Sequence, residues 1–195
     1  MSLKNINIGI GITGSFCTFA QMIDTLQMLK CENANLIPIM SYNAYNHDTK
    51  FGHAQMYIDK VEEICENKIL KTITEVEPIG PQNLLDLLLI LPCTGNTAAK
   101  LANSISDTPV TCAVKSQLRN EKPVLLAVST NDGLAGNAKN IGALLNMKHI
   151  FFVPFAQDNP QGKPRSIAYD STKVLEAIQF ALHEKQIQPI ICENK

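Results

Sequence analysis

The clearest sign of the architecture is an apolar run in the middle of the chain, Leu84-Leu85-Asp86-Leu87-Leu88-Leu89-Ile90-Leu91, which stops at Pro92. Strands that are buried on both faces read as continuous apolar runs of this kind, and they occur in parallel sheets that helices cover on both sides. As a helix the run would be far too short to cross a bilayer. We therefore predict a central strand of a parallel sheet over residues 84–91.

Strand and helix patterns alternate outward from this run in both directions. Further strands are predicted at residues 6–12, 36–40, 124–128 and 149–153. Apolar residues recur at helical spacing over residues 16–29, 54–66, 97–105, 111–118, 137–145 and 172–183. This alternation predicts an α/β fold, a Rossmann-like doubly wound parallel sheet in three αβα layers. The polar segment 43–53 and the Pro- and Gly-rich segment 155–166 are expected to be loops.

The composition indicates a folded domain with almost no net charge. The 195 residues are 45% hydrophobic and 18% charged, and the net charge is −1. We find no repeat or linker and predict a single domain over residues 1–195. So small a net charge produces no long-range attraction for nucleic acid or anionic lipid. We therefore expect no nucleic-acid or membrane partner. The charged fraction is below the roughly 25% of average soluble proteins. This favours a homo-oligomer in which part of the surface is buried between subunits.

The cysteines and histidines indicate a cytoplasmic protein without a bound metal. No two cysteines form a CxxC pair, and the first residues do not resemble a signal peptide, so free thiols in a reducing compartment are expected. The histidines show no metal-ligand spacing with one another or with cysteine. The cysteines are Cys17, Cys31, Cys65, Cys93, Cys112 and Cys192, and the histidines are His47, His53, His149 and His183.

Glycines near the first predicted strand suggest a turn that binds a nucleotide or a phosphate. Gly9, Gly11 and Gly14 spell GxGxxG, the dinucleotide-binding fingerprint. Gly9 and Gly11 fall inside the strand pattern, however, and the second strand ends in Ser41 rather than in the acidic residue that binds a nicotinamide ribose. Nicotinamide binding is therefore disfavoured. Gly14 followed by Ser15 suits either a phosphate at a helix start or a simple capped helix.

Two more polar turns follow strands that end at the same edge of the predicted sheet. The run 94–97, Thr-Gly-Asn-Thr, offers hydroxyls, a side-chain amide and free backbone N–H groups. They suit a phosphorylated sugar-like chain or the edge of a flavin ring, although a Thr-capped helix is the simpler alternative. The run 129–133, Ser-Thr-Asn-Asp-Gly, supplies similar groups after the next strand. Because these turns hold no Ser-His or Cys-His pair, we expect a bound small molecule rather than a nucleophile.

These three turns resemble the flavin-binding turns of the homo-oligomeric FMN-binding decarboxylase family. The most specific match is the segment 92–102, Pro-Cys-Thr-Gly-Asn-Thr-Ala-Ala-Lys-Leu-Ala, and the similarity extends over most of the chain. The resemblance implies a flavoprotein that binds FMN and assembles into trimers or dodecamers. The FMN contacts that it implies are Gly14, Ser15, Phe16, Ser41, Thr94, Gly95, Asn96, Thr97, Ser129 and Thr130.

Within this family, segments 49–52, 129–134, 137–142 and 153–158 are most similar to one component of a two-component oxidoreductase of endospore-forming bacteria. That enzyme produces an aromatic pyridine dicarboxylate from a dihydro precursor. The resemblance implies a small dicarboxylate substrate, a nicotinamide-dependent partner subunit without which this chain is inactive, and a place in the cytoplasm of the mother cell.

The chain also departs from the decarboxylases of the family. Of their Pro-x-Met-Asn turn it keeps only Asn131, and no flanking motif identifies either His47 or His53 as the catalytic histidine of the family. We keep Asn131, His47 and His53 as catalytic candidates. Two alternatives to the oxidoreductase reading stay open: a decarboxylase on the same scaffold, and a non-catalytic partner that stabilises the nicotinamide-dependent component.

Cationic side chains in the predicted loop 155–166 are candidates for substrate binding. A dicarboxylate needs cationic partners, and Lys163 or Arg165 could close over it as a mobile clamp. The alternative is that both are solvated loop charges. Cys93, in the most specific turn, is expected to be a small buried side chain rather than a reactive thiol.

Overall fold

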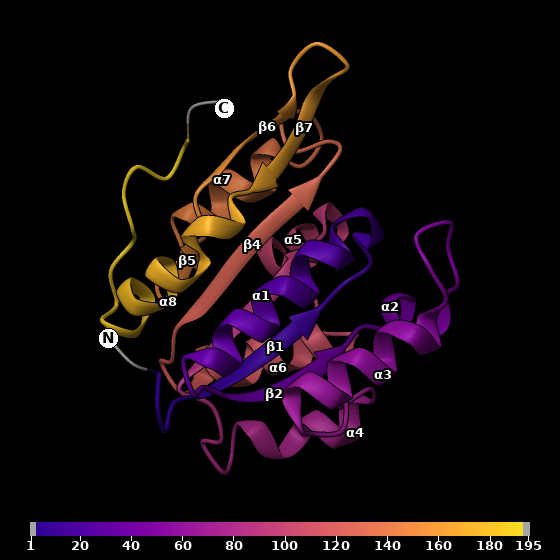
Figure 1. Ribbon diagram of the computed structural model, residues 1–195. Coiled ribbons are helices and arrows are strands. Elements are labelled where there is room, and N and C mark those ends of the chain that lie inside the picture. The colour runs from indigo at the N-terminus through magenta and orange to yellow at the C-terminus, as the bar shows by residue number, and fades with distance from the viewer. Residues whose placement is uncertain (1–2, 193–195) are drawn as a thin grey trace.

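The computed structural model describes residues 3–192 and places the strands in one mixed sheet (Figure 1). The strand order is β2-β1-β3-β4-β7-β6, and β5 pairs with β4. Strands β1 to β5 pair in parallel with one another, whereas β7 is antiparallel to β4 and to β6. The strands are β1 (Asn7–Ile12), β2 (Asn35–Met40), β3 (Leu87–Cys93), β4 (Val124–Thr130), β5 (Ile150–Phe152), β6 (Phe155–Asn159) and β7 (Lys163–Tyr169).

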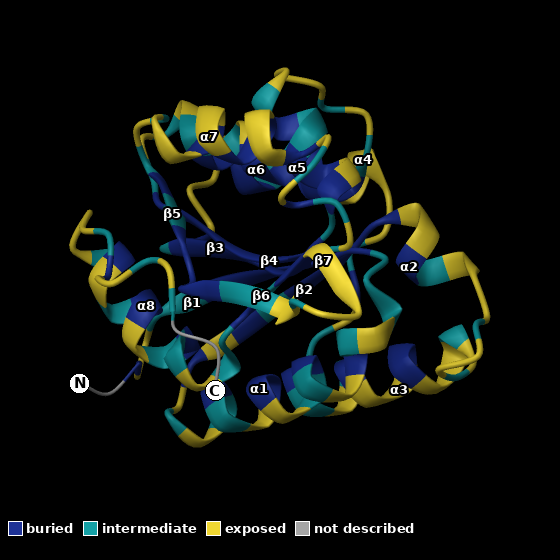
Figure 2. Ribbon diagram, turned by 90° about the horizontal axis from the view of Figure 1, so that it is seen from above, coloured by how far each residue is buried: buried dark blue, intermediate teal, exposed yellow. Residues whose placement is uncertain are grey.

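Helices cover both faces of the sheet, which confirms the predicted doubly wound, three-layer α/β fold (Figure 2). Helices α1, α3 and α8 lie on one face, and α4, α5, α6 and α7 lie on the other. Each face has its own cluster of buried apolar side chains. No helix within residues 3–192 is long and apolar enough to span a bilayer. The helices are α1 (Phe19–Cys31), α2 (Tyr42–Asn46), α3 (Ala54–Cys65), α4 (Ile73–Val76), α5 (Gly95–Ala102), α6 (Pro109–Arg119), α7 (Ala138–Leu145) and α8 (Val174–Leu182), and 3-10 turns occupy Phe16–Thr18, Glu77–Ile79 and Ser171–Lys173.

Strand β3 is the predicted central strand, but it begins and ends later in the chain than predicted. All seven of its residues are buried, as a strand covered on both faces requires. It begins only at Leu87, and the Asp86 carboxylate just before it accepts a hydrogen bond from the backbone N–H of Asn7 (2.8 Å). It also continues through Pro92 to Cys93. The register with β4 shifts between Ile90 and Cys93, and such a bulge tolerates a residue that cannot donate to the ladder.

The glycines of the GxGxxG pattern do lie inside β1. A Cβ atom at Gly9 would come within 2.5 Å of a methyl group of Leu85, and one at Gly11 within 2.6 Å of a methyl group of Ile90. Both glycines therefore let apolar side chains pack over β1. Only Gly14 lies beyond the strand, where a ligand could approach.

Two segments that we expected to be loops contain regular structure. Residues 155–166 form most of a hairpin, β6 and β7, because Phe155, Ile167 and Tyr169 alternate inward and are buried. The hairpin turn is closed by the Asn159 side chain, which accepts a hydrogen bond from the N–H of Gly162 (2.8 Å). As a result the sheet is mixed rather than wholly parallel.

The other such segment, 43–53, contains most of helix α2. The polar sequence of this segment shows no apolar periodicity, so the helix was not predicted. The helix begins where the Ser41 hydroxyl accepts a hydrogen bond from the N–H of Ala44 (3.4 Å). Ala44 is buried against the neighbouring core. The short helix thereby holds Ser41 at the end of β2, beside the end of β1.

Candidate functional site

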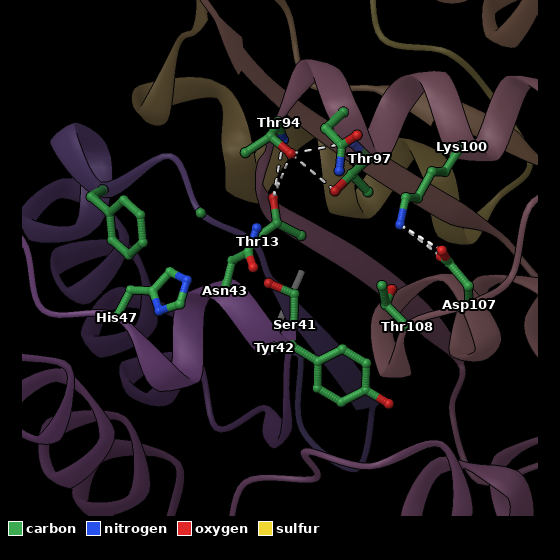
Figure 3. A pocket seen from close by; sticks show the side chains of 13 residues that line it. Thr13, Ser41, Tyr42, Asn43, His47, Thr94, Thr97, Lys100, Asp107 and Thr108 are labelled. Carbon is green, nitrogen blue, oxygen red and sulfur yellow. Dashed lines mark hydrogen bonds and ion pairs between the residues drawn. The ribbon is translucent and has the colours of Figure 1, made fainter.

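Two cavities adjoin one another at the carboxyl ends of β1, β3 and β4. The first lies between α2 and α5, has a volume of about 370 Å³ and is called the α2–α5 cavity here (Figure 3). The second, of about 680 Å³, reaches the β6–β7 hairpin and is called the hairpin cavity. Gly14, Phe16 and Thr94 line both, so they form the wall between the cavities.

The structure brings most of the predicted FMN contacts to these two cavities. Gly95 is the exception and lines neither. The α2–α5 cavity is lined by Thr13, Gly14, Phe16, Ser41, Tyr42, Asn43, His47, Thr94, Asn96, Thr97, Lys100, Asp107 and Thr108. The hairpin cavity is lined by Gly14, Ser15, Phe16, Cys17, Thr18, Gln21, Phe51, Thr94, Ser129, Thr130, Asn131, Asp158, Lys163, Ser166, Ala168 and Tyr169.

Thr13 fixes the end of β1 to the end of β3. Its hydroxyl donates a hydrogen bond to the carbonyl of Pro92 (2.7 Å) and accepts one from the N–H of Thr94 (3.0 Å). Thr13 is only 1% exposed, so these bonds lie in a dry environment where their loss would be costly. Sequence reasoning missed this residue. The one available signal was a hydroxyl directly after the last strand residue.

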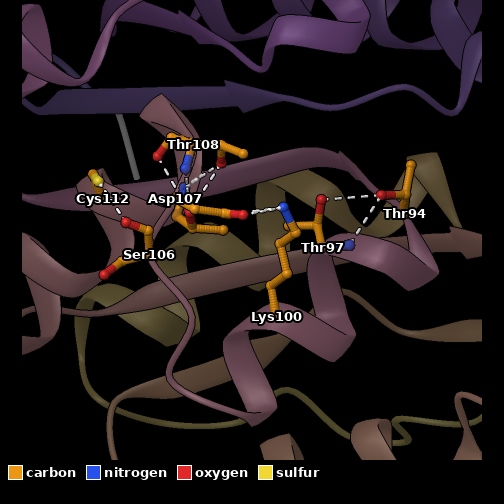
Figure 4. A network of polar contacts seen from close by, with 8 residues as sticks. Thr94, Thr97, Lys100, Ser106, Asp107, Thr108 and Cys112 are labelled. Atoms are coloured by element: carbon orange, nitrogen blue, oxygen red, sulfur yellow. Dashed lines mark hydrogen bonds and ion pairs between the residues drawn. The ribbon is translucent and has the colours of Figure 1, made fainter.

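A chain of hydroxyl groups opens helix α5 (Figure 4). The Thr94 hydroxyl accepts a hydrogen bond from the N–H of Thr97 (3.2 Å) and donates to the Thr97 hydroxyl (3.0 Å). Thr94 is therefore the helix cap that we kept as the simpler alternative, and it lines both cavities as well. At Ser15 the capping alternative is wrong: its side chain makes no cap bond and instead donates to the Ser129 hydroxyl (3.1 Å).

Gly95 is needed for packing. A Cβ atom there would lie 2.5 Å from the Thr130 hydroxyl and from the Asn137 amide nitrogen, and 2.8 Å from an oxygen of Asp132. Asp132 links the other two by hydrogen bonds: its carboxylate accepts one from the Thr130 hydroxyl (2.6 Å) and one from the Asn137 amide (2.7 Å). The start of α5 thus rests directly on a polar network, and Thr130 is held by it.

Tyr169 has a buried hydroxyl without a partner in the hairpin cavity wall. The residue is 3% exposed, and its hydroxyl makes no hydrogen bond within residues 3–192. Burial raises the pKa of Tyr169, so the phenol keeps its proton and can donate it. Buried polar groups are nearly always hydrogen-bonded, so this unpaired hydroxyl is an exception within the described residues. No local pattern in the sequence marked this residue.

The two substrate candidates on β7 lie in different surroundings. Lys163 lines the hairpin cavity, and its ammonium is bound to the Asp158 carboxylate (2.8 Å). That hydrogen bond raises the pKa of Lys163, which keeps it cationic. Arg165 is exposed and lines neither cavity. Its backbone carbonyl accepts a hydrogen bond from the N–H of Leu134 (3.0 Å).

The three catalytic candidates are likewise separated. Asn131 lines the hairpin cavity, and His47 lines the α2–α5 cavity. His53 lines neither: it is exposed and bound to the carboxylate of Asp48 (3.0 Å), a hydrogen bond that raises the pKa of His53. Cys93 is fully buried, and burial raises the pKa of its thiol to about 12, so it stays protonated and unreactive.

The α2–α5 cavity also contains an ion pair that sequence reasoning missed. The Lys100 side chain points at the carboxylate of Asp107 (Figures 3 and 4). Its ammonium lies 2.7 Å and 2.8 Å from the two carboxylate oxygens. Lys100 extends from α5, one turn after Thr97, and Asp107 lies in the loop before α6. Lys100 belongs to segment 92–102, which carries the family resemblance, but no role was predicted for it or for Asp107.

The fold and the polar strand ends together define a flavoprotein scaffold. Residues 1–179 match the model of the flavoprotein family, so this chain belongs to that family of flavin-related enzymes.

Among its relatives the chain is similar to the B subunit of dipicolinate synthase from Bacillus subtilis, with 39% identity over 99% of this chain and 96% of the relative. The crystal structure of the same B subunit from Bacillus halodurans superposes with a TM-score of 0.92 at 38% identity, and all of both chains is covered. An FMN-dependent cysteine decarboxylase gives a TM-score of 0.63 at 20% identity over 90% of this chain and 99% of that one, which shows the shared fold alone.

Proposed function

We propose that this chain is the FMN-binding B subunit of dipicolinate synthase, which acts with the A subunit to convert a dihydrodipicolinate-level precursor to dipicolinate during sporulation. The observation that carries the proposal is the match to the B subunit of this synthase, which extends over nearly the whole length of both chains. Two adjoining cavities at the carboxyl edge of the sheet are consistent with a cofactor whose ring system reaches the hairpin cavity and a substrate bound beside it.

The residues present fit FMN. Ser41 and Thr97 are each more than nine-tenths buried, and each accepts one hydrogen bond within residues 3–192 while its own proton has no acceptor there. Both line the α2–α5 cavity, as does Asn96. Such donors suit the phosphate and ribityl oxygens. Ser129 and Thr130 line the hairpin cavity, where they would approach the ring system.

The chemistry required is removal of two hydrogens from a cyclic dihydro-dicarboxylate, which makes the ring aromatic. Bound FMN supplies an acceptor for the hydride. The chain's own part is to bind and orient the substrate. Lys163 would pair with a carboxylate, the Tyr169 phenol would donate a hydrogen bond to another substrate oxygen, and Asn131 would help to fix the ring.

The assembly and its place in the cell also belong to this proposal. We expect inactivity without the nicotinamide-dependent A subunit, a homo-oligomer such as a trimer or dodecamer, and a location in the mother-cell cytoplasm. The single domain over residues 1–195 stays a prediction as well.

The first test is the visible absorption spectrum of the protein purified without added cofactor, followed by identification of the released chromophore. We expect one FMN per chain. A colourless protein that also fails to take up added FMN would contradict the flavin proposal. The second test is the aromatisation rate of the reconstituted A and B pair, measured with and without bound FMN.

Two other functions are distinguished by simple measurements. A decarboxylase would release carbon dioxide and would need His47, the one histidine among the catalytic candidates that lines a cavity. A non-catalytic partner would leave the rate of the reconstituted pair unchanged in Asn131→Ala. We expect that variant to slow the reaction while FMN content is retained.

A further inference from the structure

We propose that Asp158 is the catalytic base of this reaction: its carboxylate takes the proton that leaves the ring when the dihydro-dicarboxylate becomes aromatic. The inference rests on the proposed function and adds the acceptor that the reaction needs for its proton. One ring hydrogen leaves as a hydride, with two electrons, to the flavin. The other leaves as a proton to a carboxylate oxygen, and the electron pair of its broken bond stays in the ring and completes the aromatic system.

The hairpin cavity is lined by four titratable side chains among the described residues: Cys17, Asp158, Lys163 and Tyr169. Two of them keep their own protons, because burial raises the pKa of Tyr169 and the hydrogen bond to Asp158 raises the pKa of Lys163. A thiol such as that of Cys17 must first lose its own proton. Asp158 is the one carboxylate of this lining, and as the partner of an ammonium it is already in the form that accepts a proton.

One oxygen of the Asp158 carboxylate is free to accept that proton. Its Oδ2 accepts hydrogen bonds from the Lys163 ammonium (2.8 Å) and the Ser166 hydroxyl (3.5 Å), whereas its Oδ1 has no partner within residues 3–192. The side chain is 38% exposed, so water can carry the proton away after each turnover.

The ion pair of the α2–α5 cavity is arranged differently. Both oxygens of Asp107 accept hydrogen bonds from the Lys100 ammonium, at 2.7 Å and 2.8 Å. This bonding lowers the pKa of Asp107. With both oxygens bonded to the same cation, Asp107 is the weaker proton acceptor of the two aspartates.

Substrate binding would strengthen Asp158 as a base. The Lys163 ammonium has three N–H donors, and Asp158 takes one of them, so two are left for a substrate carboxylate. A second negative charge close to a carboxylate favours its protonated form. The same ion pair therefore holds the anionic substrate through Lys163 and receives its proton through Asp158.

The test separates proton transfer from binding in Asp158→Asn. We expect the aromatisation rate of the reconstituted A and B pair to fall about a hundredfold, because a general base is lost. FMN content should be retained. Dipicolinate binding to the FMN-loaded B chain should tighten about threefold, because a negative charge beside the dicarboxylate is removed. A residue that only supported the cavity would instead lower the rate and the affinity together.

The pH dependence of the rate identifies the proton acceptor. In the wild type the rate should rise with pH as Asp158 ionises, and this rise should be absent from Asp158→Asn. The titratable groups that face Asp158 stay the same in the variant. They are Cys17, Lys163 and Tyr169 at the hairpin cavity, and Asp170, Lys173 and Cys192 at an adjoining cavity that Asp158 also lines.

Asp59→Asn is the matched control, since Asp59 is exposed on α3 and lines neither the α2–α5 cavity nor the hairpin cavity. It should change neither the rate nor dipicolinate binding. Asp158→Glu, which keeps the carboxylate, should retain more of the rate than Asp158→Asn.

The inference is overturned if Asp158→Asn keeps the wild-type rate, or if it loses FMN or dipicolinate binding along with the rate. It is also overturned if the rise with pH persists in Asp158→Asn, or if Asp158→Glu is as slow as Asp158→Asn. Disappearance of the rise in His47→Ala or Asp107→Asn instead would assign the proton to the α2–α5 cavity. A wild-type pair that makes no dipicolinate, or a wild-type chain that binds no FMN, would contradict the proposed function itself.

Discussion

The two cavities share a wall but are built in different ways. The α2–α5 cavity is made at the ends of parallel strands by short-range capping bonds, such as Thr94 to Thr97 and Ser41 to Ala44. The hairpin cavity depends on a pairing between distant segments, in which β7 meets the last residues of β4 at Ser129 and Thr130. Local capping bonds suit a site for a permanently bound cofactor, whereas a wall formed by a hairpin near the edge of the sheet suits a substrate that must enter and leave.

The largest expected effect comes from Gly95, which supports both cavities. In Gly95→Ala the new Cβ atom overlaps Thr130 and Asn137, so we expect a loss of about 1–3 kcal/mol in the free energy of unfolding. FMN content should fall with it. Thermal or denaturant unfolding and the flavin-to-protein ratio measure the two effects.

Gly142→Ala is the matched control, because nothing lies within 4 Å of a Cβ atom at this position in α7. It should leave the stability unchanged or raise it by about 0.4–1 kcal/mol. Equal behaviour of the two variants would contradict the packing role of Gly95.

The next variant separates the hairpin cavity from its neighbour. Lys163→Ala should weaken dipicolinate binding about tenfold, because a charge-assisted contact is lost, while FMN content stays the same. Calorimetric titration of the FMN-loaded protein measures this. Arg165→Ala should have a smaller effect, since Arg165 lines neither cavity. A loss of FMN in either variant would mean that the cavities do not divide the ligands as proposed.

A smaller effect, on FMN binding instead of dipicolinate binding, is expected for the α2–α5 cavity. Thr97→Val removes a donor while keeping the side-chain shape, so FMN binding should weaken about fivefold and dipicolinate binding to the loaded protein should not change. Thr25→Val is the control: Thr25 is equally buried on α1, and its hydroxyl donates to the carbonyl of Gln21. If Thr25→Val weakens FMN binding as much, the assignment of Thr97 fails.

The smallest effect concerns Tyr169, and its sign is informative. Tyr169→Phe removes a buried hydroxyl without a partner, so the apoprotein should gain up to about 1 kcal/mol of stability while dipicolinate binding weakens about threefold. Tyr57→Phe should instead lose stability, because the Tyr57 hydroxyl donates to the carbonyl of Phe51 (2.8 Å). A loss of stability in both variants would show that Tyr169 has a partner in solution.

Sequence reasoning found what local patterns encode. The apolar run of β3 and the hydroxyl-rich turn 94–97 could be recognised because burial on both faces and helix capping each leave a short-range signature. The Lys100–Asp107 ion pair and the burial of Tyr169 could not, since each depends on which distant segment folds against it. The β6–β7 hairpin was missed for a related reason: Pro and Gly near its turn obscured the alternation of its buried residues.

The dividing wall gives the two cavities a thermodynamic connection. Phe16 and Thr94 border both spaces, so a ligand that shifts either side chain changes the shape of the neighbouring space too. If one ligand changes the affinity of the other by some factor, the second changes the affinity of the first by the same factor, because linkage is reciprocal. Filling the α2–α5 cavity would then set the affinity of the hairpin cavity, and the order in which the two ligands arrive would affect the rate of assembly but not the final occupancy.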